Sequence, residues 1–363
     1  MKKKVMVAMS GGVDSTVAAL LLSEQGCEVT GATFKLYDNE DIGIDDTSRT
    51  CCSVADVEDA QIVCARIGIR HYVFNFSLDF RRKVMERFSL AYQKGETPNP
   101  CIDCNKYIKF SKLLERAALL DKDYIATGHY AKIEYDEGKG RFLLKKARDA
   151  SKDQTYVLYA MTQDELSRTL FPLGDMLKSE VREKAEERGL INAEKPDSQD
   201  ICFVKDGNYA GFLTKAMGIK SKPGDFIDRE GKKIGTHKGI IHYTLGQRRG
   251  LNLSMGRRKY VTGINAESNT VTLGEAEDLF GSSLTAKDVN LISIAVLERP
   301  MAVTAKIRYK QEGTPAIISP LGNGDILVEF EKAQRAITPG QAVVFYDGDT
   351  VVGGGTIARE GIV

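Results

Sequence analysis

The stretch that decides the fold is Val5-Met6-Val7-Ala8-Met9-Ser10-Gly11-Gly12-Val13-Asp14-Ser15-Thr16. Its first five residues are apolar and suit a buried β-strand, and residues 14–25 carry apolar side chains at helical spacing. Glycines between a strand and a helix let the backbone approach an anion closely, and the helix N-terminus adds partial positive charge. The stretch therefore predicts a phosphate cradle. It is not a Walker loop, because the Gly-x-x-x-x-Gly-Lys-Ser/Thr spacing is absent.

Short apolar runs alternate with amphipathic segments up to residue 127, which is typical of a parallel α/β sheet. Further strands are predicted at residues 27–34, 69–76 and 123–127, and helices at 53–67, 79–94, 107–120 and 163–188. The acidic residues 38–50 and the polar residues 194–201 are predicted to be loops. Gly128 and His129 follow the carboxyl end of a predicted strand, where open α/β sheets bind their ligands.

The texture of the sequence changes after about residue 206. Gly and Lys become frequent, and short β-patterned runs follow at residues 304–309, 316–319, 326–330 and 342–345. This spacing predicts a small antiparallel barrel. The fold class is therefore α/β, with an N-terminal parallel-sheet domain at 1–206, a small basic central domain at 207–282 and a C-terminal antiparallel β-barrel at 283–363.

Length and composition exclude several classes of protein. A chain of 363 residues with 42% hydrophobic and 28% charged residues can bury more than one core and is not disordered. No apolar stretch approaches the roughly 18 residues of a membrane span. The start, Met-Lys-Lys-Lys, is followed by too short an apolar run for a signal peptide. We expect a cytoplasmic protein with no membrane partner.

Positive charge is concentrated in one segment. The net charge is only +1, yet residues 201–260 contain 13 Lys/Arg against 4 Asp/Glu. Such a segment indicates a face that binds nucleic acid, the alternative being an ordinary solvated surface. The residues expected on an RNA backbone, with affinity that falls steeply with salt, are Lys232, Lys233, Arg248, Arg249, Arg257, Arg258 and Lys259.

Three of the seven cysteines stand out. The odd number of cysteines and the absence of a secretion signal argue against a disulfide framework. Cys101 and Cys104 follow two prolines, which predicts a stiff turn, and Cys202 lies in a predicted polar loop. Neither setting needs a cysteine for packing in a hydrophobic core, so a chemical role is indicated for all three. A thiolate beside lysine and a bound nucleotide has a lowered pKa, which suits nucleophilic attack and sulfur carriage. Zn²⁺ lacks an evident fourth ligand.

The Ser-Gly-Gly-x-Asp-Ser motif resembles that of the PP-loop ATP pyrophosphatases, which split ATP between its α- and β-phosphates and adenylate an oxygen. With further motifs, the chain resembles the bacterial tRNA-specific 2-thiouridylase family over nearly its whole length. These motifs lie at residues 97–110, 124–131, 152–156, 170–174, 197–203, 243–248, 308–309 and 338–341. The resemblance implies ATP-dependent 2-thiolation of the wobble uridine in the tRNA anticodon, by adenylation of its 2-carbonyl oxygen followed by sulfur transfer.

The resemblance also assigns residues. The ATP-binding positions it implies are Ala8, Met9, Ser10, Gly11, Gly12, Val13, Asp14, Ser15, Phe34 and Gly128. Asp14 is expected to organise Mg²⁺ on the phosphates. The positions implied to contact the target base are Thr97, Pro98 and Asn99, and those implied to contact tRNA elsewhere are His129, Lys152, Asp153, Gln154, Arg308, Tyr309 and Gln341. Cys202 would carry sulfur as a persulfide, and Cys104 would release it by forming a transient disulfide with Cys202.

One position departs from the family pattern. Cys101 stands where the family has an aspartate that serves as an acid/base group. Cys101, Cys104 and Cys202 also resemble the three ligands of a [4Fe-4S] cluster in other PP-loop tRNA thiolases, which would leave one iron open to sulfide. The sulfur source thus remains open between a persulfide-relay or desulfurase protein and free sulfide. Two other functions also remain open: a PP-loop ligase that uses an amine nucleophile, and a nucleotide-sensing RNA-binding protein without catalysis.

Overall fold

The computed structural model describes residues 2–42, 54–190, 192, 200–204, 207–253 and 258–362, with side chains omitted at 54–56. Its first part is built on a five-stranded parallel sheet with the order β3-β2-β1-β4-β7. The strands are β1 (Lys4–Ala8), β2 (Glu28–Lys35), β3 (Arg70–Asn75), β4 (Tyr124–Ala126) and β7 (Thr169–Leu170). The predicted parallel α/β sheet is confirmed.

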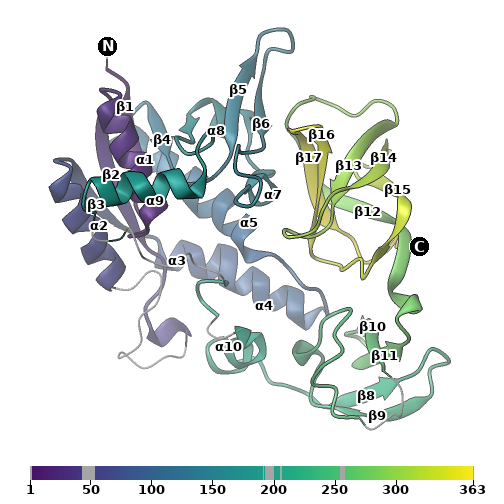
Figure 1. Ribbon diagram of the computed structural model, residues 1–363. Coiled ribbons are helices and arrows are strands. Elements are labelled where there is room, and N and C mark those ends of the chain that lie inside the picture. Colours follow the sequence, from purple (N-terminus) through teal and green to yellow (C-terminus); the bar gives the residue numbers. More distant parts are fainter. Residues whose placement is uncertain are drawn as a thin grey trace.

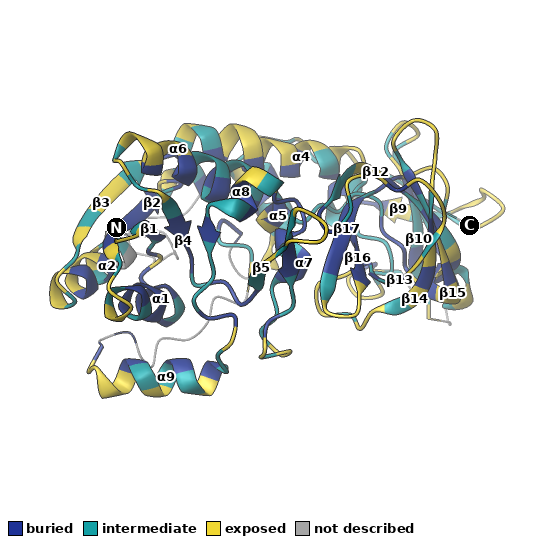
Figure 2. Cartoon of the chain, turned by 90° about the horizontal axis from the view of Figure 1, so that it is seen from above, coloured by how far each residue is buried: buried dark blue, intermediate teal, exposed yellow. Residues whose placement is uncertain are grey.

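The central strand β1 has apolar side chains on both faces because helices cover both. Val5 and Val7 pack with residues of α1 (Val13–Glu24) and α2 (Val54–Arg66), whereas Met6 belongs to the main core on the other face, with residues of α6 (Ser111–Leu119). Figure 2 shows α1 and α9 (Lys178–Glu187) on one side of the sheet and α6 on the other.

Two predicted helices differ from the observed ones. The predicted helix at 163–188 is divided into α8 (Gln163–Ser167), strand β7 and α9, because the segment crosses the edge of the sheet between its two helical pieces. The predicted helix at 79–94 begins earlier, as α3 (Ser77–Phe80), and continues through a π-helical segment (Arg81–Met85) into α4 (Glu86–Gln93). The predicted loops at 38–50 and 194–201 lie mostly outside the described residues, as do Cys51, Cys52 and Arg257.

The prediction that Cys101 and Cys104 lie on a turn is wrong. Both lie in helix α5 (Pro100–Cys104), which continues through a π-helical segment (Asn105–Phe110) into α6. The Asn99 side chain caps the helix by accepting from the Cys101 amide at 3.1 Å. Pro100 occupies the first helical turn, where its missing N–H costs nothing. The prolines therefore start this helix and do not prevent it.

A second sheet begins within the basic segment 201–260. It has the order β10-β11-β8-β9 and is preceded by helix α10 (Tyr209–Lys215). The strands are β8 (Gly224–Ile227), β9 (Lys233–His237), β10 (Tyr260–Asn265) and β11 (Thr270–Gly274). A small core of its own, centred on the fully buried Phe226 and Val261, holds this sheet together.

The C-terminal part is a closed antiparallel barrel of six strands, as predicted (Figure 1). Its strands are β12 (Phe280–Leu291), β13 (Met301–Lys306), β14 (Thr314–Pro320), β15 (Ile326–Arg335), β16 (Ala342–Asp347) and β17 (Thr350–Ile357). Strand β12 begins at Phe280, three residues before the predicted boundary at 283. A hairpin of the first part, β5 (Lys132–Asp136) and β6 (Arg141–Lys145), joins the barrel through a pairing of Lys145 with Thr350.

The barrel and the first part share one core. The hydroxyl of Tyr156, in α7 (Thr155–Leu158), donates to the Ala342 carbonyl at 2.8 Å, and the Asn290 amide donates to the Tyr159 and Met161 carbonyls at 2.7 and 2.9 Å. Barrel side chains such as Val344 lie in the same core cluster as Tyr156. Among the described residues, no helix has both the length and the apolarity needed to cross a membrane.

We expect Tyr156→Phe to lower the free energy of unfolding by about 1–3 kcal/mol, because the Ala342 carbonyl loses its buried donor. Urea unfolding followed by circular dichroism measures the change. Tyr135→Phe is the matched control, since Tyr135 is 55% exposed. Equal unfolding midpoints for the two variants would contradict the role of this hydrogen bond.

Candidate active site

The turn between β1 and α1 is built to receive an anion. Gly11 has a φ of +70°, in the region that favours glycine, and Gly12 occupies the N-cap position, where it has no side chain to satisfy the first helical amides. The Ser15 hydroxyl donates to the Gly12 carbonyl at 3.0 Å and accepts from the Ser10 amide at 3.2 Å. The turn is thus held in shape from within, and the start of α1 fits a phosphate group.

The predicted ATP-binding positions meet at the carboxyl edge of the parallel sheet. Ala8 ends β1, Phe34 lies near the end of β2, and Gly128 follows β4. A Cβ on Gly128 would lie 2.7 Å from backbone atoms of Asp14 and Ser15, so only glycine lets this segment pack on the first turn of α1. The structure therefore brings these positions together, while their contact with ATP stays a prediction.

The carboxylate of Asp14 already has partners. The Lys178 ammonium lies 2.7 and 2.8 Å from its two oxygens, and the Tyr130 hydroxyl donates to it at 2.8 Å. The expected role of Asp14 in organising Mg²⁺ does not fit this arrangement, because the carboxylate is neutralised by a lysine that is only 8% exposed. The sequence analysis missed Lys178. No signal in the sequence marks it, because the predicted helix at 163–188 places Lys178 in a helix interior and not at a helix start.

Cys104 lies inside the main core rather than on a surface turn. Its side chain is 8% exposed, and burial raises the pKa of its thiol to about 11, while the Lys109 ammonium opposes that shift. Cys101 is exposed, yet desolvation by the surrounding protein raises the pKa of its thiol too, again against Lys109. The predicted lowering of these pKa values is therefore wrong for the free protein, because desolvation outweighs the single nearby cation.

Cys202 is held by its neighbours. The Tyr37 hydroxyl donates to the Cys202 carbonyl at 2.7 Å. The next residue, Phe203, is 2% exposed and packs its ring against three aromatic side chains. These are Phe80, Phe88 and Phe212, with ring centroids 5.7, 5.4 and 4.9 Å away. The aromatic cluster fixes this segment on the core that also contains Cys104.

Tyr209 of α10 connects the two cysteine segments. Burial raises the pKa of its hydroxyl, and the nearby acidic groups Asp200 and Cys101 raise it further. Tyr309 of the barrel behaves in the same way: burial raises its pKa first, followed by Asp153 and Cys101. Cys101 thus lies where the first part, α10 and the barrel meet.

The whole chain was compared with known proteins. Family models match residues 3–206 ("tRNA methyl transferase HUP domain"), 210–275 ("tRNA methyl transferase PRC-barrel domain") and 281–357 ("Aminomethyltransferase beta-barrel domain"). A tRNA-specific 2-thiouridylase of Thermoanaerobacter sp. (strain X514) is 54% identical over 362 residues, which are 99% of this chain and 100% of the relative. The one of Clostridioides difficile (strain 630) is 52% identical over 360 residues, 99% of each chain. The chain belongs to the tRNA-specific 2-thiouridylase family.

The family predicted from the motifs is thus confirmed. The relatives named 2-thiouridylases match the chain over its full length, whereas the models named for methyl transfer each match one part. Among solved structures, a 4-thiouridine synthetase–RNA complex with bound ATP covers 56% of this chain and 46% of its own, with 18% identity. Its TM-score of 0.36 is too low to bear on function.

Several positions that the 2-thiouridylase family implies for RNA have structural partners here. Asp153 accepts from the Ala147 amide at 3.1 Å and the Thr155 hydroxyl at 2.7 Å, and Gln154 accepts from the Tyr130 amide at 2.9 Å. Lys152, which comes directly before Asp153 and Gln154 in the chain, also interacts with other residues of the protein. These hydrogen bonds hold the 152–154 loop in place within the protein. Contact of this loop with RNA stays a prediction.

His129 differs from the other implied RNA contacts because it is buried. Its side chain is 8% exposed, with Nδ1 at 2.6 Å from the Thr127 hydroxyl and its ring between Phe110 and Phe171. Desolvation lowers its pKa well below the ordinary value, so the ring is neutral at pH 7. As placed, His129 offers little surface to RNA.

The remaining implied RNA positions lie near the barrel. The Thr97 amide donates to the Pro339 carbonyl at 2.9 Å, which joins the segment containing Pro98 to the barrel. Arg308 donates to the Ala336 carbonyl at 3.0 Å. Gln341 accepts through its carbonyl from the Ile357 amide at 2.7 Å. The structure therefore gathers most of the implied positions on the side where the barrel meets the cysteine helix.

The proposed iron–sulfur ligands do not come together. No group of three or more His, Cys, Asp or Glu side chains is placed to hold a metal ion within the described part of the chain. Cys101, Cys104 and Cys202 thus do not fit a cluster in this arrangement. Asp103, which neighbours Cys104, lies 3.2 Å from the Arg87 Nε, and burial raises the pKa of its carboxyl. It is a second acid/base candidate that the sequence analysis missed.

We expect Lys109→Met to raise the pKa of the Cys101 and Cys104 thiols, because the one nearby cation that favours their thiolates is removed. Only the thiolate reacts, so alkylation by iodoacetamide at a pH below both pKa values should slow about three- to tenfold. Peptide mass spectrometry after timed alkylation across pH 7–10 measures each thiol.

Lys112→Met is the matched control, because Lys112 lies close by in the chain but is paired with Glu115 at 3.0 Å. Superimposable pH profiles for Lys109→Met and the wild type would show that Lys109 has no effect on either thiol.

Proposed function

We propose that this chain is a tRNA-uridine 2-sulfurtransferase that uses ATP to convert the wobble uridine of tRNA to 2-thiouridine. The observation that supports the proposal is that Cys104 and Cys202 belong to or pack against the same core as Ala8 and Phe34, which lie at the carboxyl ends of β1 and β2. The relatives that match the chain end to end, at 52–54% identity, are named tRNA-specific 2-thiouridylases.

In the first step, the 2-carbonyl oxygen of the uridine attacks the α-phosphorus of ATP, and pyrophosphate leaves. Residues 8–15 would hold the phosphates, with the amides at the start of α1 stabilising the charge that develops. The uridine must leave the anticodon stack to bring its oxygen to this edge. Thr97, Pro98 and Asn99 would receive the base, since this segment leads directly into the cysteine helix.

In the second step, Cys202 carries the transferred sulfur as a persulfide. The Cys104 thiolate attacks the Cys202 sulfur, a Cys104–Cys202 disulfide forms, and hydrosulfide is released. Hydrosulfide attacks C2 of the activated uridine, AMP leaves, and loss of a proton gives the thiocarbonyl. An external thiol then reduces the disulfide. A persulfide-relay or desulfurase protein would load Cys202, in a cytoplasmic setting.

The high thiol pKa values bear on this sequence of steps. Cys104 must lose its proton before it attacks, and burial keeps that proton on. Cys101, in the position of the family aspartate, or Asp103 beside Cys104 would accept it. Tyr309 and Tyr209 border Cys101, so bound RNA would change the surroundings of that thiol directly.

We expect Cys104→Ser and Cys202→Ser each to reduce 2-thiouridine formation by at least about a hundredfold, because each removes a sulfur that the transfer requires. Pyrophosphate release in the presence of tRNA should persist for the first turnover, since the phosphate site is intact, whereas AMP should stay on the uridine because no sulfur displaces it. Nucleoside mass spectrometry and pyrophosphate release measure the two reactions.

Cys27→Ser serves as the control because Cys27 is half-buried and packs against the core on the α1–α2 face of the sheet, not against the core that contains Cys104 and Cys202. Full activity of the Cys104→Ser, Cys202→Ser double variant would instead indicate a ligase with another nucleophile. Binding of tRNA without pyrophosphate release would indicate a protein that only binds RNA.

We expect protein purified without oxygen to contain far less than one iron–sulfur cluster per chain, because its three candidate ligands are not grouped. Iron and acid-labile sulfide assays with visible absorption give the answer. A near-stoichiometric cluster that disappears in Cys101→Ala would overturn the persulfide route and make free sulfide the sulfur source.

A further inference from the structure

Three residues that can bind a nucleotide lie close to one another where the second sheet meets the barrel. Phe280 of β12 lies directly opposite Arg335 of β15 in the antiparallel ladder, so both side chains lie on the same face. The Arg335 guanidinium lies 5.3 Å from the ring centre of Tyr260 in β10. Tyr260, Arg335 and Phe280, here called the row, thus neighbour one another in this order, Phe280 through the strand register alone; Phe280 is 53% exposed and Arg335 is also exposed.

Positive charge surrounds this row. Arg308 is exposed and lies close to Arg335, and the pKa of its guanidinium is lowered by desolvation and by the Arg335 charge. Neither guanidinium forms an ion pair with a carboxylate in the part of the chain that the structure describes. The turn at Gly246 approaches from the second sheet, since a Cβ there would lie 4.0 Å from the Arg335 Nη1. Exposed Arg248 and Arg249 follow that turn.

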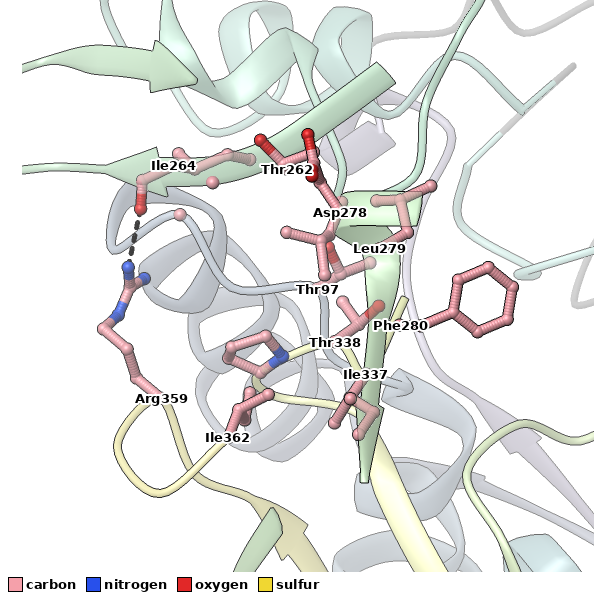
Figure 3. Close-up of a pocket in the computed structure, with 15 residues that line it drawn as sticks. Thr97, Thr262, Ile264, Asp278, Leu279, Phe280, Ile337, Thr338, Arg359 and Ile362 are labelled. Carbon is pink, nitrogen blue, oxygen red and sulfur yellow. Dashed lines mark hydrogen bonds between the residues drawn. The ribbon is translucent and has the colours of Figure 1, made fainter. Parts of the chain in front are cut away.

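The row borders a cavity of about 340 Å³ between the three parts of the chain (Figure 3). Arg359 stabilises this junction by donating to the Ile264 carbonyl at 2.6 Å and to the Lys94 carbonyl. In Figure 3 the Phe280 ring points away from the cavity, whereas Thr97 lies beside it. The row is therefore an outer surface, connected through the junction to the segment that precedes the cysteine helix.

We propose that Tyr260, Arg335 and Phe280 form a platform on which an unpaired nucleotide of the RNA substrate stacks, outside the reaction site. The base lies on the exposed Phe280 ring and the edge of the guanidinium, and Arg335 and Arg308 bind the neighbouring phosphates. This inference rests on the proposed function, because it takes the RNA substrate from it.

The chemistry of the row favours an unpaired nucleotide over other partners. Bases of single-stranded RNA stack on aromatic rings and guanidinium planes, whereas a paired RNA helix offers mainly phosphates and 2′-hydroxyls to a protein. Guanidinium groups without a carboxylate partner attract an anion, and the exposed Phe280 ring beside Arg335 suits a flat partner. An unpaired nucleotide supplies both the flat base and the phosphate within a single nucleotide unit.

The test measures binding of tRNA and of a fully paired RNA duplex to the full chain. Phe280→Ala should weaken tRNA binding about five- to tenfold and leave duplex binding unchanged, with the same salt dependence as the wild type. Phe280→Tyr should restore tRNA binding, since the ring is restored. Arg335→Met should weaken binding and reduce the salt slope by about one.

Two controls isolate the platform. Tyr135→Ala removes another exposed aromatic ring, on β5. Arg299→Met removes an exposed guanidinium at the opposite end of β13 from Arg308. Neither variant should change tRNA binding. Unchanged tRNA binding in Phe280→Ala, or an equal loss for the duplex, would overturn the proposal. Wild-type protein that binds tRNA through the platform yet forms no 2-thiouridine would instead contradict the proposed reaction and leave the platform standing.

Discussion

The ion pair between Lys178 and Asp14 is the interaction on which the reactive edge of the sheet depends. It joins α9 to the first turn of α1, and the Tyr130 hydroxyl joins the segment after β4 to the same carboxylate. The Tyr130 amide in turn donates to the Gln154 side-chain oxygen, and the Gln154 amide donates to the Tyr130 carbonyl, each at 2.9 Å. Loss of one partner of such a mostly buried pair leaves an uncompensated charge, so the pair constrains the phosphate turn and the 152–154 loop together.

Sequence patterns were sufficient where local rules decide the structure. The β1–turn–α1 unit, the parallel sheet and four of the six barrel strands follow from apolar periodicity and turn residues. Strand β17 was missed because Gly353 and Gly354 interrupt its pattern, yet glycine is required there: added Cβ atoms would lie 2.3 Å from the Asn290 carbonyl oxygen and 2.6 Å from that of Val343. These close approaches exist only in the folded barrel.

The site shows the same division. The positions at the ends of the strands could be predicted because a parallel sheet places them together. The burial of Cys104 and His129 could not, since it depends on core side chains from distant elements such as Phe171. Lys178 was missed for the same reason: in sequence it is one of two lysines on a polar helix, and only the fold brings it to Asp14. The motifs identified the family, and the tertiary contacts then corrected the environment of its cysteines.

The raised pKa values of the thiols slow their attack on a sulfur or carbon atom, and they also protect the thiols from oxidation. The thiolate is the form that peroxides oxidise, so a cysteine kept protonated by burial resists overoxidation between turnovers. Full deprotonation then depends on changes in the surroundings, such as those made by bound RNA beside Cys101. In the free protein Cys101 and Cys104 are thus kept at low reactivity.

The pairing of Lys145 with Thr350 has a consequence for synthesis on the ribosome. The hairpin of β5 and β6 leaves the ribosome about 200 residues before the strand with which it pairs. At roughly 5–20 residues per second, that hairpin waits on the order of 10–40 s with an unpaired edge. The shared core around Tyr156 is likewise completed only when the barrel arrives. Early fragments of this chain are therefore expected to need protection from aggregation, and activity can begin only after the last strand is made.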